Sequence, residues 1–258
     1  MTRDFDGRVI LISGATGGFG TVAASALAQA GARLVLTDLH QDKLEELAAT
    51  VDTEIAVLAG DVSDPQLAKA CVEMASKRFG RLDGAFNNAG VEQTLTRQPD
   101  TDQATVDKVM SVNFLGVHYA MQAQIPYLHQ RFKETGEVGS ILNTASIAGV
   151  VGAPKLSVYA AAKHAVVGLS RSAALEYARH GVRVNTLCPV FFRTRMVMDG
   201  IVKDFDDTEQ GLKQLAAGIP LGRIGEPEEV VPAVLFALSP ANTFFTGQEI
   251  RLDGAMTA

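Results

Sequence analysis

One stretch, Val9-Ile10-Leu11-Ile12-Ser13-Gly14-Ala15-Thr16-Gly17-Gly18-Phe19-Gly20, predicts the fold of this chain. Its first part, 9–13, is short and almost wholly apolar, as is typical of a strand buried on both faces of a parallel sheet. Glycines follow at once, and the alanine-rich segment 21–30 then favours a helix. Strand, glycine turn and helix in this order are the context in which a dinucleotide binds, with its pyrophosphate at the helix N-terminus. The spacing Gly-x-x-x-Gly-x-Gly differs from the commoner Gly-x-Gly-x-x-Gly, but both let the backbone turn sharply.

An acidic residue lies at the distance from this turn that nucleotide binding requires. Asp38 is 18 residues after Gly20 and ends a second expected strand, 33–38. There its carboxylate can accept hydrogen bonds from the adenosine ribose hydroxyls. The alternative is a solvated Asp38 that caps the helix expected from Gln41. A carboxylate here would repel the 2′-phosphate of NADP, and the glycine turn carries no basic residue, so the sequence predicts NAD as the cofactor.

Strand-length apolar runs alternate with helical segments along the whole chain. After the first two strands, further strands are expected at 54–59, 84–87, 140–144, 182–187 and 249–252. Helices are expected at 41–50, 65–79, 105–132 and 157–180, and another is expected to start at Pro227. This alternation is typical of a parallel sheet covered by helices on both faces. The sequence therefore predicts an α/β fold of the Rossmann type, a doubly wound parallel sheet of about seven strands, in a single domain that spans 1–258.

The stretch 193–218 lacks a strand where the alternation would place one. It is interpreted as a mobile helical flap beside the substrate.

The composition argues against several classes of protein. The chain has 258 residues, 47% of them hydrophobic, which is enough to bury a sizeable core. A net charge of −6 without a basic cluster disfavours nucleic-acid binding. Two cysteines and five histidines show no metal-ligand spacing, so no metal site is expected. No apolar run is long enough to cross a membrane and the first residues lack the apolar region of a signal peptide, so a cytoplasmic protein is expected.

A second motif, Ser157-Val158-Tyr159-Ala160-Ala161-Ala162-Lys163, points to proton transfer. The spacing i, i+4 puts the phenol of Tyr159 and the ammonium of Lys163 on one face of a helix. A positive charge beside a phenol favours the phenolate and lowers the phenol's pKa. Such a pair can act as an acid and base. The alternative is a half-buried tyrosine and a solvated lysine, because the two residue types often meet at this spacing by chance.

Together, the motifs resemble those of the short-chain dehydrogenase/reductase family over nearly the whole chain. The glycine turn 13–20 is similar to the family's Thr-Gly-x-x-x-Gly-x-Gly, with serine in place of threonine. Asn87-Asn88-Ala89-Gly90 matches the motif that follows the fourth strand, and Asp61-Val62 resembles the segment that contacts adenine. The run 189–194 resembles Pro-Gly-x-x-x-Thr, with Val190 where glycine is usual and Phe192 where a smaller aliphatic residue often packs on the nicotinamide. Thr246-Gly247-Gln248 and Leu252-Asp253-Gly254 resemble the C-terminal signature.

The resemblance implies the catalytic residues Asn113, Ser146, Tyr159 and Lys163. Tyr159 would exchange a proton with the substrate oxygen, and Lys163 would lower its pKa and hold the nicotinamide ribose. Ser146 would hydrogen-bond the substrate oxygen, and Asn113 would hold a water that links Lys163 to solvent. Outside the family pattern, Ser146 could be a loop residue and Asn113 a buried residue bonded to neighbouring backbone. The implied cofactor-binding residues are Gly14, Thr16, Gly17, Gly18, Phe19, Gly20, Asp38, Leu39, Asp61, Val62, Asn88, Ala89, Gly90, Tyr159, Lys163, Pro189, Phe192 and Thr194.

The implied activity is hydride transfer between NAD(H) and a secondary alcohol or ketone. Apolar residues on segments that flank the active site in the family imply a mainly apolar substrate cavity and a cyclic or medium-sized apolar secondary alcohol as substrate. They are Val150, Val151, Val190, Phe191, Met196 and Met198. One alternative is a 3-oxoacyl carrier-protein reductase, an enzyme that usually favours NADP, which Asp38 disfavours. Another is a dinucleotide-binding regulator without catalysis, which the intact set of four catalytic residues disfavours. The resemblance also implies that the two long helices, 105–132 and 157–180, pair across a two-fold axis. A homotetramer with closed symmetry is therefore expected.

Overall fold

The structure, a computed structural model, describes residues 4–205 and 207–258. Within these residues seven parallel strands form one sheet in the order β3-β2-β1-β4-β5-β6-β7. The strands are β1 (Val9–Ser13), β2 (Arg33–Asp38), β3 (Ile55–Ala59), β4 (Gly84–Asn87), β5 (Gly139–Thr144), β6 (Val182–Pro189) and β7 (Glu249–Leu252). The predicted doubly wound parallel sheet is confirmed. The strand order reverses between β1 and β4, and a ligand of such a sheet binds at the carboxyl ends of the strands beside this point.

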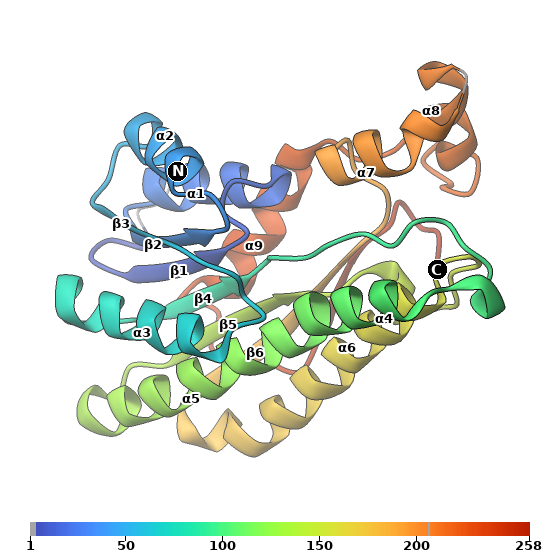
Figure 1. The fold of residues 1–258 in the computed structure, drawn as a ribbon. Coiled ribbons are helices and arrows are strands. Elements are labelled where there is room, and N and C mark those ends of the chain that lie inside the picture. The colour runs from blue at the N-terminus through green and yellow to red at the C-terminus, as the bar shows by residue number, and fades with distance from the viewer. Residues whose placement is uncertain (1–3, 206) are drawn as a thin grey trace.

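Helices cover both faces of the sheet (Figure 1). One face carries α3 (Pro65–Phe79), α5 (Gly116–Thr135) and α6 (Ser157–Tyr177). The other carries α1 (Gly18–Gln29), α2 (Gln41–Thr50) and α9 (Val231–Leu238).

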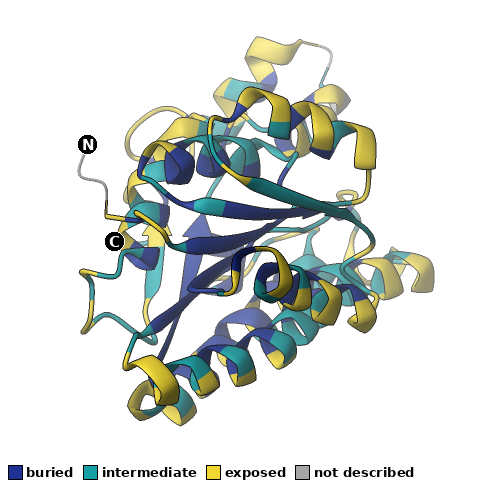
Figure 2. Ribbon diagram, turned by 90° about the vertical axis from the view of Figure 1, so that its left-hand side faces the viewer, coloured by how far each residue is buried: buried dark blue, intermediate teal, exposed yellow. Residues whose placement is uncertain are grey.

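The almost wholly apolar sequence of β1 follows from this double cover. Val9 and Leu11 join the core on the α3 and α5 side, whereas Ile10 and Ile12 join the core on the α1 side. Successive side chains of a strand point to opposite faces, so a strand covered on both faces favours apolar residues at odd and even positions alike. Figure 2 shows that the central strands are buried while the outer helix faces are exposed.

The single long helix expected at 105–132 is interrupted in the structure near its N-terminal end. This part of the chain forms α4 (Gln103–Met110), a π-helical turn (Ser111–Leu115) and α5. Pro126 lies inside α5 and does not end this helix. Two other predicted helices differ at their ends. α6 stops at Tyr177 and a 3₁₀ turn continues to His180, and a 3₁₀ turn at Pro227–Val230 precedes α9.

The predicted flap is helical. It contains α7 (Arg195–Gly200), a 3₁₀ turn (Val202–Asp204) and α8 (Thr208–Ala216). Residue 206, which also belongs to the predicted flap, lies outside the described residues. Figure 1 shows α7 and α8 projecting beyond the carboxyl ends of the strands, where a ligand of this fold binds. Its mobility remains a prediction.

None of the helices within the described residues is both long enough and apolar enough to cross a membrane.

Candidate active site

The glycine turn between β1 and α1 is packed so closely that side chains do not fit. Gly14 has φ +63°, and a Cβ there would lie 2.7 Å from Ala89 Cα. A Cβ on Gly18 would lie 2.8 Å from Thr194 Cγ2. The amide of Asn88 donates to Gly14 O at 3.0 Å. The structure therefore brings together three of the segments predicted to bind the cofactor: the turn, 88–90 and 189–194.

The N-terminus of α1 is open to an anion. Its N-cap residue, Gly17, provides no side-chain hydrogen bond, and no acidic residue stands in the first turn. The first backbone N–H groups of a helix have no partner inside the helix and carry its positive dipole end. The free backbone N–H groups at the N-terminus of α1 therefore fit the pyrophosphate of a dinucleotide.

The carboxylate of Asp38 is fixed at the carboxyl end of β2. Its Oδ2 accepts hydrogen bonds from the backbone N–H of Thr16 at 2.9 Å and from the Thr16 hydroxyl at 2.7 Å. Its Oδ1 accepts one from the backbone N–H of Leu39 at 2.8 Å. An ionised carboxylate has about four acceptor positions, so Oδ1 retains one for a ribose hydroxyl.

Three of the predicted catalytic side chains converge at the carboxyl end of β5. Ser146 follows this strand, and the interaction of its hydroxyl with the phenol of Tyr159 acts to lower the pKa of the phenol. The Ser146 hydroxyl accepts from the backbone N–H of Ala148 at 3.1 Å and donates to Pro189 O at 3.4 Å, and these two contacts fix its direction. Lys163 Nζ lies 5.6 Å from the centroid of the Tyr159 ring and donates to Thr144 O at 2.8 Å. The i, i+4 spacing on α6 therefore does place phenol and ammonium side by side.

The pKa values of this pair differ from the sequence expectation because both groups are buried. Burial raises the pKa of Tyr159, and the hydrogen bond to Ser146 acts in the opposite direction. Burial lowers the pKa of Lys163 from 10.5 to about 8. The sequence predicted a phenol acidified by its lysine, but in this structure burial has the larger effect on the pKa of Tyr159, and the effect that opposes it comes from Ser146.

Asn113 lies fully buried in the π-helical turn. Its Oδ1 accepts from the backbone N–H of Val91, and its Nδ2 donates to the carbonyl of Val91, both at 2.8 Å. The side chain thus fixes the segment that follows Gly90, a contact of the kind that the alternative interpretation expects. π-helical turns often occur at functional sites.

The segment that follows β6 packs against the glycine turn. Val190 donates its backbone N–H to Leu252 O at 3.0 Å, as part of a regular extension of the sheet. Phe192 is buried, and its ring meets that of Phe19 edge-on, with centroids 5.1 Å apart. Phe192 therefore covers the side of the glycine turn.

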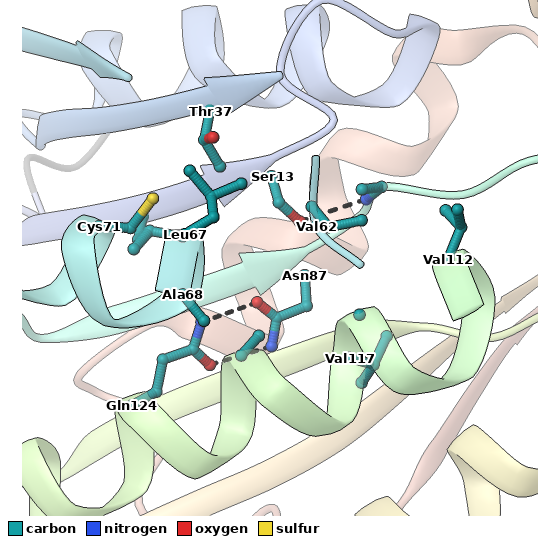
Figure 3. A pocket seen from close by; sticks show the side chains of 14 residues that line it. Ser13, Thr37, Val62, Leu67, Ala68, Cys71, Asn87, Val112, Val117 and Gln124 are labelled. Carbon is teal, nitrogen blue, oxygen red and sulfur yellow. Dashed lines mark hydrogen bonds between the residues drawn. The ribbon is translucent and has the colours of Figure 1, made fainter. Parts of the chain in front are cut away.

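A cavity of about 30 Å³ lies between the sheet and helices α3 and α5 (Figure 3). Its lining includes Val62 and Ala89, which are predicted cofactor contacts. Figure 3 shows Asn87 and Gln124 paired below it, and the two amides exchange hydrogen bonds of 3.0 and 2.8 Å. Because Val62 and Ala89 line it, the cavity lies beside the position expected for the adenine. A space of this size holds about one or two waters, so the cavity is too small for the base itself.

Sequence reasoning missed one residue of the site, Gln93. Its side-chain oxygen accepts from the backbone N–H of Tyr159 at 2.9 Å. Gln93 is 3% exposed. The only signal in the sequence is a polar residue three positions after the Asn-Asn-Ala-Gly motif.

Comparison with known proteins identifies the family. A family profile described as enoyl-(acyl carrier protein) reductase matches residues 14–257. The chain is 36% identical to 2,5-dichloro-2,5-cyclohexadiene-1,4-diol dehydrogenase of Sphingobium indicum, over 99% of both chains. The chain belongs to the short-chain dehydrogenase/reductase family. The resemblance seen in the sequence is thereby confirmed, and with it the oxidoreductase class.

Other members of the short-chain dehydrogenase/reductase family match equally well. Cyclohexanol dehydrogenase of an Acinetobacter species is 37% identical, over 100% of this chain and 98% of the relative. The crystal structure of levodione reductase superimposes with a TM-score of 0.92 at 35% identity and covers 97% of this chain and 98% of that chain. The arrangement of the whole sheet and its helices is therefore that of the family.

Proposed function

We propose that this protein is an NAD(H)-dependent dehydrogenase that interconverts a cyclic secondary alcohol and its ketone. The observation that carries the proposal is the group of Ser146, Tyr159 and Lys163 at the carboxyl end of β5, with the glycine turn and Asp38 on the same edge of the sheet. Relatives named for cyclohexanol and for a cyclohexadienediol support a ring substrate.

The residues of the group divide the proton chemistry between them. A bound nicotinamide supplies the hydride acceptor or donor. The phenol of Tyr159 gives its proton to the ketone oxygen during reduction and, as phenolate, takes the proton of the alcohol during oxidation. Ser146 orients the phenol and donates a hydrogen bond to the same substrate oxygen, which stabilises the charge that develops there.

Lys163 and Asn113 support this step. The ammonium of Lys163 is held by Thr144 O close to the phenol. It favours the phenolate electrostatically and would hold the nicotinamide ribose. Asn113 would place a water on the path from Lys163 to solvent, and through Val91 it positions the loop that faces α6.

The cofactor would bind along the carboxyl edge of the sheet. The N-terminus of α1 would take the pyrophosphate, and Asp38 with Leu39 would take the adenosine ribose. The remaining residues proposed to bind the cofactor are Gly14, Thr16, Gly17, Gly18, Phe19, Gly20, Asp61, Val62, Asn88, Ala89, Gly90, Tyr159, Lys163, Pro189, Phe192 and Thr194. Asp38 favours NAD because a 2′-phosphate would remove a hydrogen-bond donor and bring like charges together.

The flap would close over the substrate. Met196 in α7 and Val151 after β5 are partly exposed large apolar residues, 38% and 39%, and suit a mainly apolar substrate pocket.

The proposed assembly is a homotetramer, and the proposed location is the cytoplasm. Leu175, which is 85% exposed on α6, would be covered by pairing of this helix across a two-fold axis.

The decisive experiment is a steady-state assay by NADH absorbance with cyclohexanol, cyclohexanone, open-chain secondary alcohols and a 3-oxoacyl thioester. The expected result is the highest kcat/KM on the ring alcohol and ketone. Faster turnover of the thioester would support the carrier-protein reductase instead. Cofactor binding without turnover of any alcohol or ketone would support a regulator.

A further inference from the structure

The side chain of Gln93 is held in one orientation beside Tyr159. A backbone N–H can only donate, so the group that meets the Tyr159 N–H at 2.9 Å must be the amide oxygen. The contact lies in the first turn of α6, where a helix leaves its N–H groups without partners inside the helix. The amide nitrogen of Gln93 therefore has a fixed place as well.

That nitrogen is buried and has no hydrogen-bond partner among the described residues. The residue as a whole is 3% exposed, so bulk water does not satisfy it. A buried donor without a partner costs about 1–3 kcal/mol, and each such group in a native structure calls for an explanation. A second buried polar atom without a partner, the hydroxyl oxygen of Ser157, lies two residues before Tyr159 on the same turn of α6.

The surroundings of Gln93 belong to the substrate side of the site. Its neighbour Val91 is bonded to Asn113, and the carboxylate of Glu92 occupies the space where a Cβ on Gly200 would stand. Gly200 ends α7, the first helix of the flap. The segment 91–93 thus lies between Asn113, one of the proposed catalytic residues, and the end of α7 in the flap.

We infer that Gln93 is a specificity residue whose amide nitrogen donates a hydrogen bond to a second oxygen on the substrate. The preferred substrates are then ring ketones and alcohols that carry a hydroxyl or carbonyl group in addition to the reacting one. The inference rests on the proposed function and names the substrate class within it. A site that presents a buried donor discriminates strongly against an analogue that lacks the acceptor, because the donor is then left unpaired.

The test compares substrates that differ by one polar group. The positional isomers of hydroxycyclohexanone are reduced with NADH, each beside the methylcyclohexanone of matched shape. For the wild type, kcat/KM should be at least about tenfold higher for the best hydroxyl compound than for its methyl counterpart. In Gln93→Met, which keeps the length of the side chain and removes its polar atoms, this ratio should fall to about one. Gln66→Met, on the exposed face of α3, is the matched control and should keep the wild-type ratio.

A second variant guards against misfolding of the first. Gln93→Glu keeps one oxygen to accept from the Tyr159 N–H. When the introduced carboxyl group is ionised, its other oxygen is an acceptor in the place of the amide donor, and an alkaline assay pH ensures ionisation. The wild type should reduce a cyclohexanedione with a higher kcat/KM than cyclohexanone, and Gln93→Glu should lose this preference, because two acceptors then face each other.

The ratio separates the possible outcomes. If Gln93 only positions Tyr159, or if water alone satisfies its nitrogen, the rates on both ketones change together and the ratio stays at its wild-type value, which overturns the inference. A wild type that reduces methylcyclohexanones as well as the hydroxyl compounds overturns it too and leaves the proposed function standing. A wild type inactive on every ring ketone overturns both.

Discussion

Thr16 holds Asp38 through two hydrogen bonds that end on the same carboxylate oxygen. The backbone N–H lies 2.9 Å and the hydroxyl 2.7 Å from Oδ2. The glycine turn thus fixes the residue expected to distinguish NAD from NADP. Because charge-assisted hydrogen bonds are about twice as strong as neutral ones, the carboxylate should keep its position when the cofactor leaves.

The first prediction concerns this carboxylate. Asp38→Ala should lower the ratio of kcat/KM with NAD to kcat/KM with NADP by at least about tenfold, because a hydrogen bond to a charged group contributes about 1.5–3 kcal/mol and the repulsion of the 2′-phosphate also disappears. Steady-state kinetics with both cofactors measures the ratio. Asp42→Ala, on the exposed first turn of α2, is the matched control. Equal use of NADP by the wild type would contradict the role given to Asp38.

The second prediction concerns the acid and base. Tyr159→Phe removes only the phenolic oxygen, so kcat should fall at least about a hundredfold while the affinity for NADH stays nearly unchanged. Tyr119→Phe, a partly buried tyrosine on α5, should retain wild-type activity. Turnover and a fluorescence titration of NADH give the two quantities. A variant with more than about a tenth of wild-type kcat would exclude Tyr159 as the base.

The third prediction is the pH dependence of the reaction. Burial raises the pKa of Tyr159, so the phenol is protonated at neutral pH and its phenolate fraction grows as the pH rises. The rate of alcohol oxidation needs the phenolate and should increase with pH from neutral until Lys163, with a pKa of about 8, loses the proton that favours the phenolate. The rate of ketone reduction needs the protonated phenol and should not increase. Profiles of kcat/KM in both directions check this, and an oxidation rate that is flat between neutral and alkaline pH would refute it.

The fourth prediction links Lys163 to stability. Burial lowers its pKa from 10.5 to about 8, so between these values the unfolded chain binds a proton that the folded chain does not. The free energy of unfolding of the wild type should therefore rise over this range relative to Lys163→Met, by up to about 3 kcal/mol. Denaturant titrations of the cofactor-free proteins at several pH values measure the difference.

The control for this prediction is Lys69→Met, which removes an exposed lysine of α3. A difference between wild type and Lys163→Met that stays constant with pH would mean that Lys163 is not desolvated as the structure indicates.

The sequence predicted the sheet well because its signals are local. β4 and β7 have the predicted limits, and the alternation of elements was enough to predict the parallel order of the fold. The i, i+4 spacing also placed Tyr159 beside Lys163. These features depend on neighbours along the chain.

What the sequence did not predict depends on residues far apart. Gln93 and Tyr159 are 66 positions apart, and nothing near Gln93 indicates that its amide meets that backbone. The edge-on packing of Phe19 against Phe192 likewise joins two residues that lie far apart in the sequence. The pKa of Tyr159 was misjudged because spacing reveals a neighbouring charge, whereas burial appears only once the chain is folded.

The π-helical turn at 111–115 makes the number of residues at that point as important as the identity of Asn113. Each residue of an α-helix advances the helix by about 100°, and an i to i+5 turn accommodates one residue more than a regular turn. Deleting a single residue there would give a more regular helix but would rotate α4 against α5 and carry Asn113 away from Val91. The loop with Gln93 would lose its anchor. A shortened enzyme would thus become more helical while it loses its substrate, so evolution cannot change the number of residues in this turn more easily than it can replace Asn113.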